Sequence, residues 1–434
     1  MIPKKISAEK TLEILQRESF SYFINETNLE NGLVRDKNAP NWPASIAAVG
    51  FALASYPIAV ERGFISRQEA IKRVLTTLTF FWNSRQGPEP DATGYRGFYY
   101  HFLDMQTGRR TWNCELSTID TSLLLAGALS AGQYFDASTS EEHTIRTLAE
   151  SLYRRADWRW AIGRSAKISL GWKPEKGFLP YRWEGYNEGL LIYILGLGSP
   201  THPLPHTSYE AWASSYQWVH SYGYDYLYSG PLFTHQFSHL WIDFRDIQDS
   251  FMRKHDSDYF ENSRKATFIQ QRYAIDNPHG FKEYGPYCWG ITASDGPGSK
   301  TLSINGVKHK FYNYIARGVP YGPDDGTLSP WAMVASLPFA SEIVLPAIEY
   351  CLHKLDLKTG YPYDFKASLN KTFSSKKLYP YGWISPWNFG INQGPIILMI
   401  ENYRSGLLWK LMRSCPYIVE GLRRADFKGG WLTP

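Results

Sequence analysis

The amino-acid sequence predicts an all-α protein in which pairs of helices close into a ring, an (α/α)6 toroid. Three observations predict it. Apolar segments with a helical period alternate with more polar segments along the 434 residues. Long loops rich in Gly, Pro and aromatic residues recur between the pairs. Few segments alternate apolar and polar residues as strands do, and residues 177–182 and 307–311 are the candidates for short hairpins.

The helices follow from apolar spacing and from start and stop signals. Residues 42–62 are almost entirely apolar, which indicates burial on most sides. Gly63 ends that helix, and Ser66 caps the next one. The apolar helix at residues 115–135 is followed by a more polar partner. We expect helices at residues 7–25, 42–62, 66–83, 115–135, 140–155, from 187 onward, 209–222, 258–275, 330–355 and 393–413.

Repeated helical pairs also fit an open solenoid. The long, chemically rich loops and the lack of a fixed-period motif favour the closed toroid. Proline- and glycine-rich segments at residues 196–205 and 284–298 are short and aromatic, unlike flexible linkers. We therefore predict one domain over residues 1–434.

Composition restricts the class of function. Aromatic residues make up 16% of the chain, and many lie in loops, at residues 95–102, 222–233 and 379–389. Most aromatic residues of a large protein fill its core, but rings on loops are natural stacking platforms, and sugars are a ligand that suits them. The net charge of +5 arises from interspersed residues, so nucleic acid is not an expected partner.

Other classes lack their signals. No 18-residue apolar run predicts a membrane span. The N-terminal residues lead into an amphipathic helix instead of a signal sequence, so we expect a cytoplasmic protein, or a periplasmic or secreted one if a leader was removed. We also expect a monomer. The four cysteines are widely spaced and are interpreted as buried thiols. Nucleotide-binding loops, HExxH and GxSxG are missing, and the histidines lack metal-ligand spacing, so we expect no cofactor and no metal.

Two pairs of acids stand at the start of apolar helices. Glu115 and Asp120 precede or begin one of them, and capping explains Glu115 better than Asp120. Glu184 and Glu188 precede the other, in the aromatic segment WEGYNEG. Burial beside Trp and Tyr would raise a carboxyl pKa, as a general acid requires. Glycoside hydrolysis needs two such carboxyl groups across the scissile bond.

We take these four acids as catalytic candidates, with Glu188 or Glu184 as the general acid and the base among Glu115, Asp120 and Asp295. Asp243 and Arg245 suggest a buried ion pair first and a substrate contact second. Asp325 lies in an Asp–Asp–Gly sequence that could be only a turn signal. The substrate-binding candidates are His101, Trp183, Tyr186, Trp241, Asp243, Arg245, Trp289, Asp295, Asp325, Trp387 and Gln393.

Several of these segments together resemble the glucoamylase-like family that includes glycoside hydrolase family 144. The resemblance extends from Glu115 to Trp409 and rests on ELSTIDTSLLLAGAL, WEGYNEGLLIYILGLGSPTHP, HLWIDFRDIQD, FENSRKATFIQQRYAIDNP, YCWGITASDGP, DDGTLSPWAMVASLPFASE and NQGPIILMIENYRSGLLW. It implies an (α/α)6 toroid and an inverting hydrolase of β-glucan, with β-1,2-linked glucan the characterised substrate of relatives. It also places the four catalytic candidates in the family's active-site segments.

Two other classes of function remain open on the sequence alone. One is a transglycosylase or a glycan-binding protein without catalysis on the same fold. The other is a helical scaffold for protein partners, which would present a broad apolar face and no acid-lined cleft.

Overall fold

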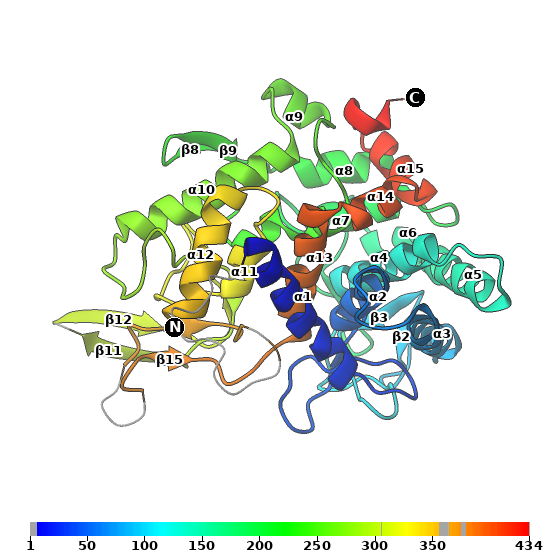
Figure 1. The fold of residues 1–434 in the computed structure, drawn as a ribbon. Helices are drawn as coiled ribbons and strands as arrows, with labels where there is room; N and C mark the ends of the chain where they lie inside the picture. Colours follow the sequence, from blue (N-terminus) through cyan, green and yellow to red (C-terminus); the bar gives the residue numbers. More distant parts are fainter. Residues whose placement is uncertain (1–6, 305, 356–362, 364, 375–378, 434) are drawn as a thin grey trace.

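The computed structural model describes residues 7–304, 306–355, 363, 365–374 and 379–433 of the chain (Figure 1). Six inner segments form a ring. Neighbouring inner segments pack against each other, and the last one, α13, packs back against the first, α2. Between η1–η2 and α11 the ring is joined by the Gln236 amide, which donates to the Ala332 carbonyl oxygen at 2.6 Å. The predicted all-α toroid is confirmed.

An outer helix covers each inner segment. The inner segments are α2 (Ile46–Glu61), α4 (Thr118–Tyr134), α7 (Gly189–Leu197), η1 (Leu232–His235) with η2 (Phe237–Leu240), α11 (Pro330–Val334) and α13 (Gly390–Arg404). In the same order, the outer helices are α3 (Arg67–Asn83), α5 (Ser140–Arg155), α15 (Pro416–Arg424), α10 (Tyr259–Asp276), α12 (Ser341–His353) and α1 (Ala8–Asn25).

The inner helices are apolar on all sides because other elements surround them. Every residue of α2 from Ile46 to Ala59 is buried. Glycines let α2 and α4 approach closely. A Cβ atom at Gly50 would lie 2.3 Å from the Leu123 carbonyl oxygen, and one at Gly127 would lie 2.1 Å from the carbonyl oxygen of Gly50. A side chain at either position would force the two helices apart.

The outer helices are amphipathic, and four of them, α1, α3, α5 and α10, begin at side-chain caps. The Ser66 hydroxyl accepts a hydrogen bond from the Glu69 amide at 3.1 Å, and the Thr139 hydroxyl accepts one from the Glu142 amide at 3.3 Å. Each cap satisfies an amide that has no partner inside its helix. The remaining helices are α6 (Trp158–Ile162), α8 (His206–Ala213), α9 (Ser250–Lys254), α14 (Leu407–Arg413) and η3 (Gly430–Leu432).

All strands are short and belong to small antiparallel sheets. Five form one sheet in the order β2 (Gly94–Tyr95), β3 (Phe98–Tyr100), β5 (Leu116–Ser117), β6 (Gly171–Lys173), β7 (Gly177–Phe178). The others form pairs: β1 (Ala44–Ser45) with β4 (Phe102–Leu103), β8 (Trp218–Ser221) with β9 (Tyr224–Leu227), β10 (Ala293–Ser294) with β13 (Ile315–Ala316), β11 (Lys300–Ile304) with β12 (Val307–Phe311), and β14 (Leu369–Asn370) with β15 (Trp383–Ile384). The β11–β12 hairpin extends from the edge of the molecule (Figure 1).

These small sheets tie the N-terminal ends of the inner segments together. β1 leads into α2 and β5 leads into α4, and the Ile46 amide donates to the His101 carbonyl oxygen at 3.2 Å. Lys37, upstream of α2, forms a bridge with Phe389, which precedes α13. The loop between residues 290 and 295 contacts the starts of both η1 and α11, through Phe233 and Ser329. One end of the toroid therefore gathers loops from the whole chain.

Several predicted helices are confirmed within a residue or two, at 7–25, 66–83, 140–155 and 258–275. Both predicted hairpin segments contribute one strand to a hairpin that begins upstream of the predicted bounds, β6–β7 and β11–β12. The helices predicted from 42 and from 115 begin later, at Ile46 and Thr118, because the residues before them pair as strands.

Three predictions were wrong in detail. The helix expected at 209–222 ends at Ala213, and residues 218–227 form a hairpin whose turn at Tyr222 and Gly223 has positive φ. The helix expected at 330–355 is two helices, α11 and α12. The helix expected at 393–413 is also two, because Gly406 adopts a left-handed φ of 69° between α13 and α14.

One buried apolar cluster extends through the inner and outer helices from Leu12 to Leu432. All four cysteines are buried thiols, as predicted. Among the helices of the described residues, none combines the length and the apolar character needed to cross a membrane.

Candidate active site

Acidic side chains from different loops meet where the inner segments begin. The Tyr314 hydroxyl lies close enough to these acidic side chains to be affected by their charges. Burial of that hydroxyl raises its pKa, and the negative charges of Asp36, Asp295, Asp120 and Glu188 raise it further. The Tyr314 side chain is nevertheless 58% exposed. The Tyr314 side chain is therefore open to solvent at the place where these four carboxyl groups come near one another.

The first acid group centres on His101, between β3 and β4. Its Nδ1 atom lies 2.9 Å from Glu115 Oε1, and its Nε2 atom lies 3.7 Å from Asp120 Oδ2. Burial alone would lower the pKa of His101, but the carboxylates of Asp120 and Glu115 outweigh it and raise the pKa to about 9. The ring is therefore an imidazolium at neutral pH, and its charge in turn lowers the pKa of Glu115 against the effect of burial.

Asp120 lies in the first turn of α4 and is 6% exposed. Besides the nearby imidazolium, it receives a hydrogen bond from the Ser117 hydroxyl at 2.5 Å. Ser117 is also the N-cap of α4 and accepts from the Asp120 amide. Glu115 and Asp120, both predicted as catalytic acids, thus share one histidine.

Glu188 is the residue immediately before α7 and is partly exposed. Burial raises the pKa of its carboxyl from 4.5 to about 7, and the negative charge of Asp120 adds to that rise. A carboxyl group of this kind keeps its proton near neutral pH and can donate it.

Asp36 belongs to the same group of acids and was missed by the sequence analysis. Burial raises the pKa of Asp36 to about 6, although a hydrogen bond from the Trp42 indole nitrogen, 3.1 Å long, works against the rise. A signal was present. Asp36 stands in an irregular, proline- and tryptophan-containing segment just before an apolar helix, as the recognised acids do.

Asp295 follows β10 and completes the group of acids. Its carboxyl oxygens accept hydrogen bonds from the hydroxyls of Ser368 at 2.5 Å and Ser385 at 2.6 Å. Burial raises the pKa of Asp295, and these hydrogen bonds only partly reverse the effect. Nearby Lys366 is affected in the opposite sense, since burial lowers its pKa to about 8.

Aromatic side chains accompany the acids. Trp387, a predicted substrate-binding residue, lies 5.5 Å from the ammonium of Lys37, which also lies 3.7 Å from the ring of Trp42. The charge of Asp295 acts on the same ammonium. Lys37, Trp42 and Tyr314 were not predicted, because only the tertiary structure brings their loops to this end.

The second acid of the WEGYNEG segment is placed differently. Glu184 is exposed and forms an ion pair with Lys167. Its neighbour Trp183 donates its indole N–H to the Thr118 hydroxyl at 2.9 Å, which ties the segment to the start of α4. Tyr186 is 6% exposed and packs among other rings, with His235 at 5.1 Å. The structure therefore brings Glu188, and not Glu184, to the acid cluster, which consists of Asp36, Glu115, Asp120, Glu188 and Asp295.

Several predicted substrate-binding residues are instead engaged in core packing or in ion pairs, although Arg245 itself is exposed. Trp241 is completely buried and stacks on Phe51 at 6.1 Å. Asp243 forms the predicted ion pair with Arg245 at 2.6 Å and a second one with Arg413. Core packing and charge pairing explain these three positions, so they are not retained as substrate contacts.

Trp289, Asp325 and Gln393 are also buried, at 1% exposure each. Asp325 pairs with the buried Arg317 at 2.7 Å and is more than a turn signal. Gln393, in the first turn of α13, differs from the others, because its amide oxygen and nitrogen have no hydrogen-bond partner among the described residues. Within the same part of the chain, no group of three or more His, Cys, Asp or Glu side chains is arranged to hold a metal ion.

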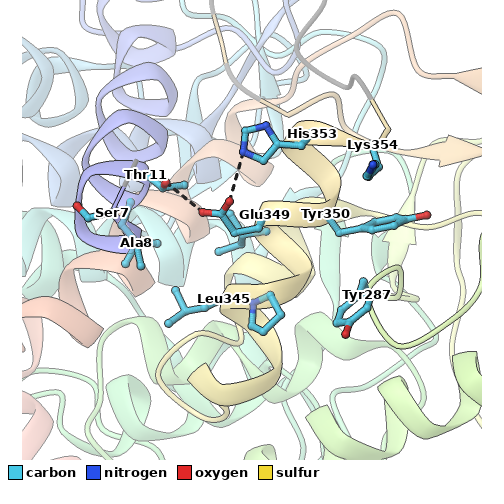
Figure 2. A pocket seen from close by; sticks show the side chains of 12 residues that line it. Ser7, Ala8, Thr11, Tyr287, Leu345, Glu349, Tyr350, His353 and Lys354 are labelled. Carbon is cyan, nitrogen blue, oxygen red and sulfur yellow. Dashed lines mark hydrogen bonds and ion pairs between the residues drawn. The ribbon is translucent and has the colours of Figure 1, made fainter. Parts of the chain in front are cut away.

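A groove of about 740 Å³ lies apart from the acid cluster, on the outer wall between the start of α1 and α12. Figure 2 shows Glu349 of α12 between Thr11 and His353, with oxygen–oxygen and nitrogen–oxygen distances of 3.3 Å to each. The lining of this groove is mostly apolar and contains one carboxylate, that of Glu349. The groove therefore lacks the two opposed carboxyl groups that glycoside hydrolysis needs.

Comparison with known proteins agrees with this geometry. Residues 180–416 match the family model described as "Putative glucoamylase". A crystal structure from Bacteroides uniformis ATCC 8492 with the same description is 30% identical, covers 99% of this chain and 100% of its own, and superposes with a TM-score of 0.87.

Two further relatives have named activities. An endo-β-1,2-glucanase from Chitinophaga pinensis, solved with sophorotriose and glucose, is 28% identical with a TM-score of 0.83, covering 99% of this chain and 100% of its own. A curated exo β-1,2-glucooligosaccharide sophorohydrolase from Parabacteroides distasonis is 28% identical over 96% of this chain. The chain spans 58% of the length of that relative.

Proposed function

Since the chain belongs to the glucoamylase-like family, we propose that it is a glycoside hydrolase that cleaves β-1,2-linked glucan. The observation that carries the proposal is Glu188. This partly exposed carboxyl lies among other acids, and its pKa is raised to about 7. A group that remains protonated near neutrality can protonate the departing glycosidic oxygen.

Asp120 is the proposed base. Its charge acts on Glu188, and its Oδ2 atom lies 3.7 Å from the His101 ring nitrogen and accepts a hydrogen bond from the Ser117 hydroxyl at 2.5 Å. An ionised carboxylate opposite a protonated one is the arrangement that hydrolysis by inversion requires, with water between them at a separation of roughly 6.5–9.5 Å. Glu115 is held by His101 and therefore acts through that ring. Asp295 has a raised pKa and is less suited to accept a proton.

The substrate class follows from the relatives and from the side chains at the acid cluster. Both relatives with named activities act on β-1,2-linked glucose chains. The acids, Lys37, Tyr314 and Trp387 supply the polar and aromatic groups that sugar hydroxyls and ring faces contact. We propose further that residues 1–434 act as one catalytic domain and as a monomer without a cofactor.

The test is a reducing-end assay of the purified protein on β-1,2-, β-1,3-, β-1,4- and α-1,4-linked glucans. We expect product from the β-1,2-linked glucan alone, with the initial product in the inverted anomeric configuration by proton NMR. Activity should persist in a chelator. Hydrolysis of the α-1,4-linked glucan in preference to the β-1,2-linked one would overturn the proposed substrate. Products longer than the starting oligosaccharide would show transglycosylation instead.

A further inference from the structure

Trp112 is displayed on the surface in an unusual way. Its side chain is 53% exposed, although tryptophan is usually buried. Its backbone has a φ of 56°, and the next residue, Asn113, has a φ of 49°. Two consecutive left-handed residues are rare outside glycine, and for a bulky side chain such a φ is an outlier. Residues held in this way cluster at binding sites, where the surrounding structure imposes the conformation.

The surrounding structure does impose it. Arg110 is buried, donates to the Cys114 carbonyl oxygen at 2.6 Å, and pairs with Glu175. The Lys173 ammonium donates to the Asn113 carbonyl oxygen at 2.9 Å. These contacts clamp the backbone of the loop from 110 to 114, on which Trp112 lies.

Two aromatic rings pack against the Trp112 ring. Trp42 lies 4.8 Å away at an interplanar angle of 71°, and Phe102 lies 5.1 Å away at 58°. Each of these two rings also contacts the acid cluster or its histidine. The Trp42 indole donates to Asp36, and Phe102 stacks on His101 at 3.8 Å. The exposed ring is therefore linked, through one further ring on either side, to Asp36 and to His101, and His101 lies 3.7 Å from the proposed base Asp120.

We infer that Trp112, supported by Trp42 and Phe102, is a stacking platform for a glucosyl residue of the substrate outside the acid cluster. The inference rests on the proposed function and adds a binding subsite to it. An indole presents a large rigid face to the C–H face of a sugar ring and loses little conformational entropy in doing so. A ring on a clamped loop loses even less, because that loop has already been ordered.

A contrasting residue supports the assignment. Trp82 is also exposed, at 40%, but it belongs to the outer helix α3, and Arg155 covers its ring at 4.8 Å. The ring of Trp82 contacts a charged side chain. The rings that contact Trp112 also contact Asp36 and His101. This makes Trp82 a matched control.

The experiment measures binding by calorimetry in the Glu188→Gln background, with a β-1,2-linked pentasaccharide and the corresponding disaccharide. Trp112→Leu, which keeps an apolar side chain on Trp42 and Phe102 but removes the flat ring, should weaken pentasaccharide binding about tenfold. Trp112→Phe should stay within about threefold, and Trp82→Leu should leave binding unchanged. Folding of each variant is checked by its melting temperature.

Unchanged pentasaccharide affinity in Trp112→Leu would overturn the platform. A measurable loss of affinity that is equal in Trp112→Phe and in the control Trp82→Leu would also overturn it. Failure of the proposed function has a different result. In that case the wild-type protein releases no reducing ends from β-1,2-linked glucan. If the Glu188→Gln protein then binds a differently linked pentasaccharide in a Trp112-dependent way, the platform stands and the linkage is wrong.

Discussion

Two pairs of buried carboxyl groups, one pair near each end of the toroid, differ in how they are stabilised. Toward the C-terminal ends of the inner segments, Glu401 pairs with Arg62 at 2.6 Å, and Asp243 pairs with Arg245 and Arg413. At the N-terminal ends, Asp36 receives an indole hydrogen bond, and Asp295 receives two hydroxyl hydrogen bonds. Both groups are withdrawn from water, but their partners differ in charge.

The partner decides the protonation state. Burial would raise the pKa of Glu401, but Arg62 and further hydrogen bonds lower it. The pKa values of Asp36, Glu188 and Asp295 remain raised. A guanidinium fixes a carboxylate as a permanent anion, which suits structure. Neutral donors leave a carboxyl group able to exchange a proton near neutral pH, which suits catalysis.

The largest effect should come from Glu188→Gln. The amide keeps the shape of the side chain but has no proton to donate, so kcat on the best glucan should fall by roughly 10²–10⁴-fold, the scale of acid–base catalysis. Substrate affinity should be nearly unchanged. The measurement is steady-state kinetics on β-1,2-linked glucan with calorimetric binding. A kcat within twofold of wild type would remove Glu188 from the role of acid and turn attention to Asp36.

The next effect concerns the other end. Arg62→Met leaves the buried Glu401 without its guanidinium, and breaking a buried pair from one side costs about 3–5 kcal/mol of unfolding free energy. Denaturant unfolding measures that loss, while kcat of the folded protein should stay near wild type. The double variant Arg62→Met, Glu401→Gln is the control and should recover part of the stability. A large fall in kcat with intact stability would contradict the division of roles between the ends.

The sequence predicted the scaffold better than the site, for physical reasons. Apolar spacing and caps depend on neighbours three or four residues away, so α1, α3, α5 and α10 could be predicted. The hairpin at Trp218–Leu227 was missed because aromatic residues fit a helix pattern as well as a strand pattern. Acids at the start of apolar helices led to Asp120 and Glu188, and the neighbouring aromatic residues singled out the segment of Glu188.

The same reasoning could not separate members of one motif. Glu184 and Glu188 look alike in sequence, and only the loop geometry directs one to Lys167 and the other to the acid cluster. Trp241 and Trp112 are both tryptophans near acids, yet one is fully buried and the other is 53% exposed. Tyr314 has no sequence signal, because its role depends on a loop that crosses from β12 to β13.

A smaller effect is expected for His101→Gln. The imidazolium positions Asp120 and Glu115 without being assigned to touch the substrate, so kcat should fall about tenfold, within the range of a lost charge-assisted hydrogen bond. The pKa of His101 is raised from 6.5 to about 9. Its stabilisation is therefore complete below pH 6.5 and is lost as the pH rises through 9.

Thermal unfolding between pH 6 and pH 9.5 tests that sign. The wild-type protein should lose stability over this window relative to His101→Gln, so the gap between them should narrow as the pH rises. His101→Asn, which is shorter, should lose more activity than the Gln variant if positioning is the cause. A gap that is constant from pH 6 to pH 9.5 would show that His101 is not the imidazolium that its surroundings imply.

The smallest effect is expected for Glu184→Gln, four residues from Glu188 in the same segment. Glu184 is exposed and pairs with Lys167, and exposed ion pairs contribute roughly 0–1 kcal/mol. Its loss should change kcat and KM by less than twofold, and the melting temperature should barely move. Because the two glutamates share a motif and an identical substitution, the pair isolates environment as the variable. A fall of a hundredfold in Glu184→Gln with normal turnover in Glu188→Gln would reverse the assignment. It would also mean that the loop before α7 rearranges when substrate binds, since in the present arrangement the Glu184 carboxylate is paired with Lys167 and not with the acid cluster.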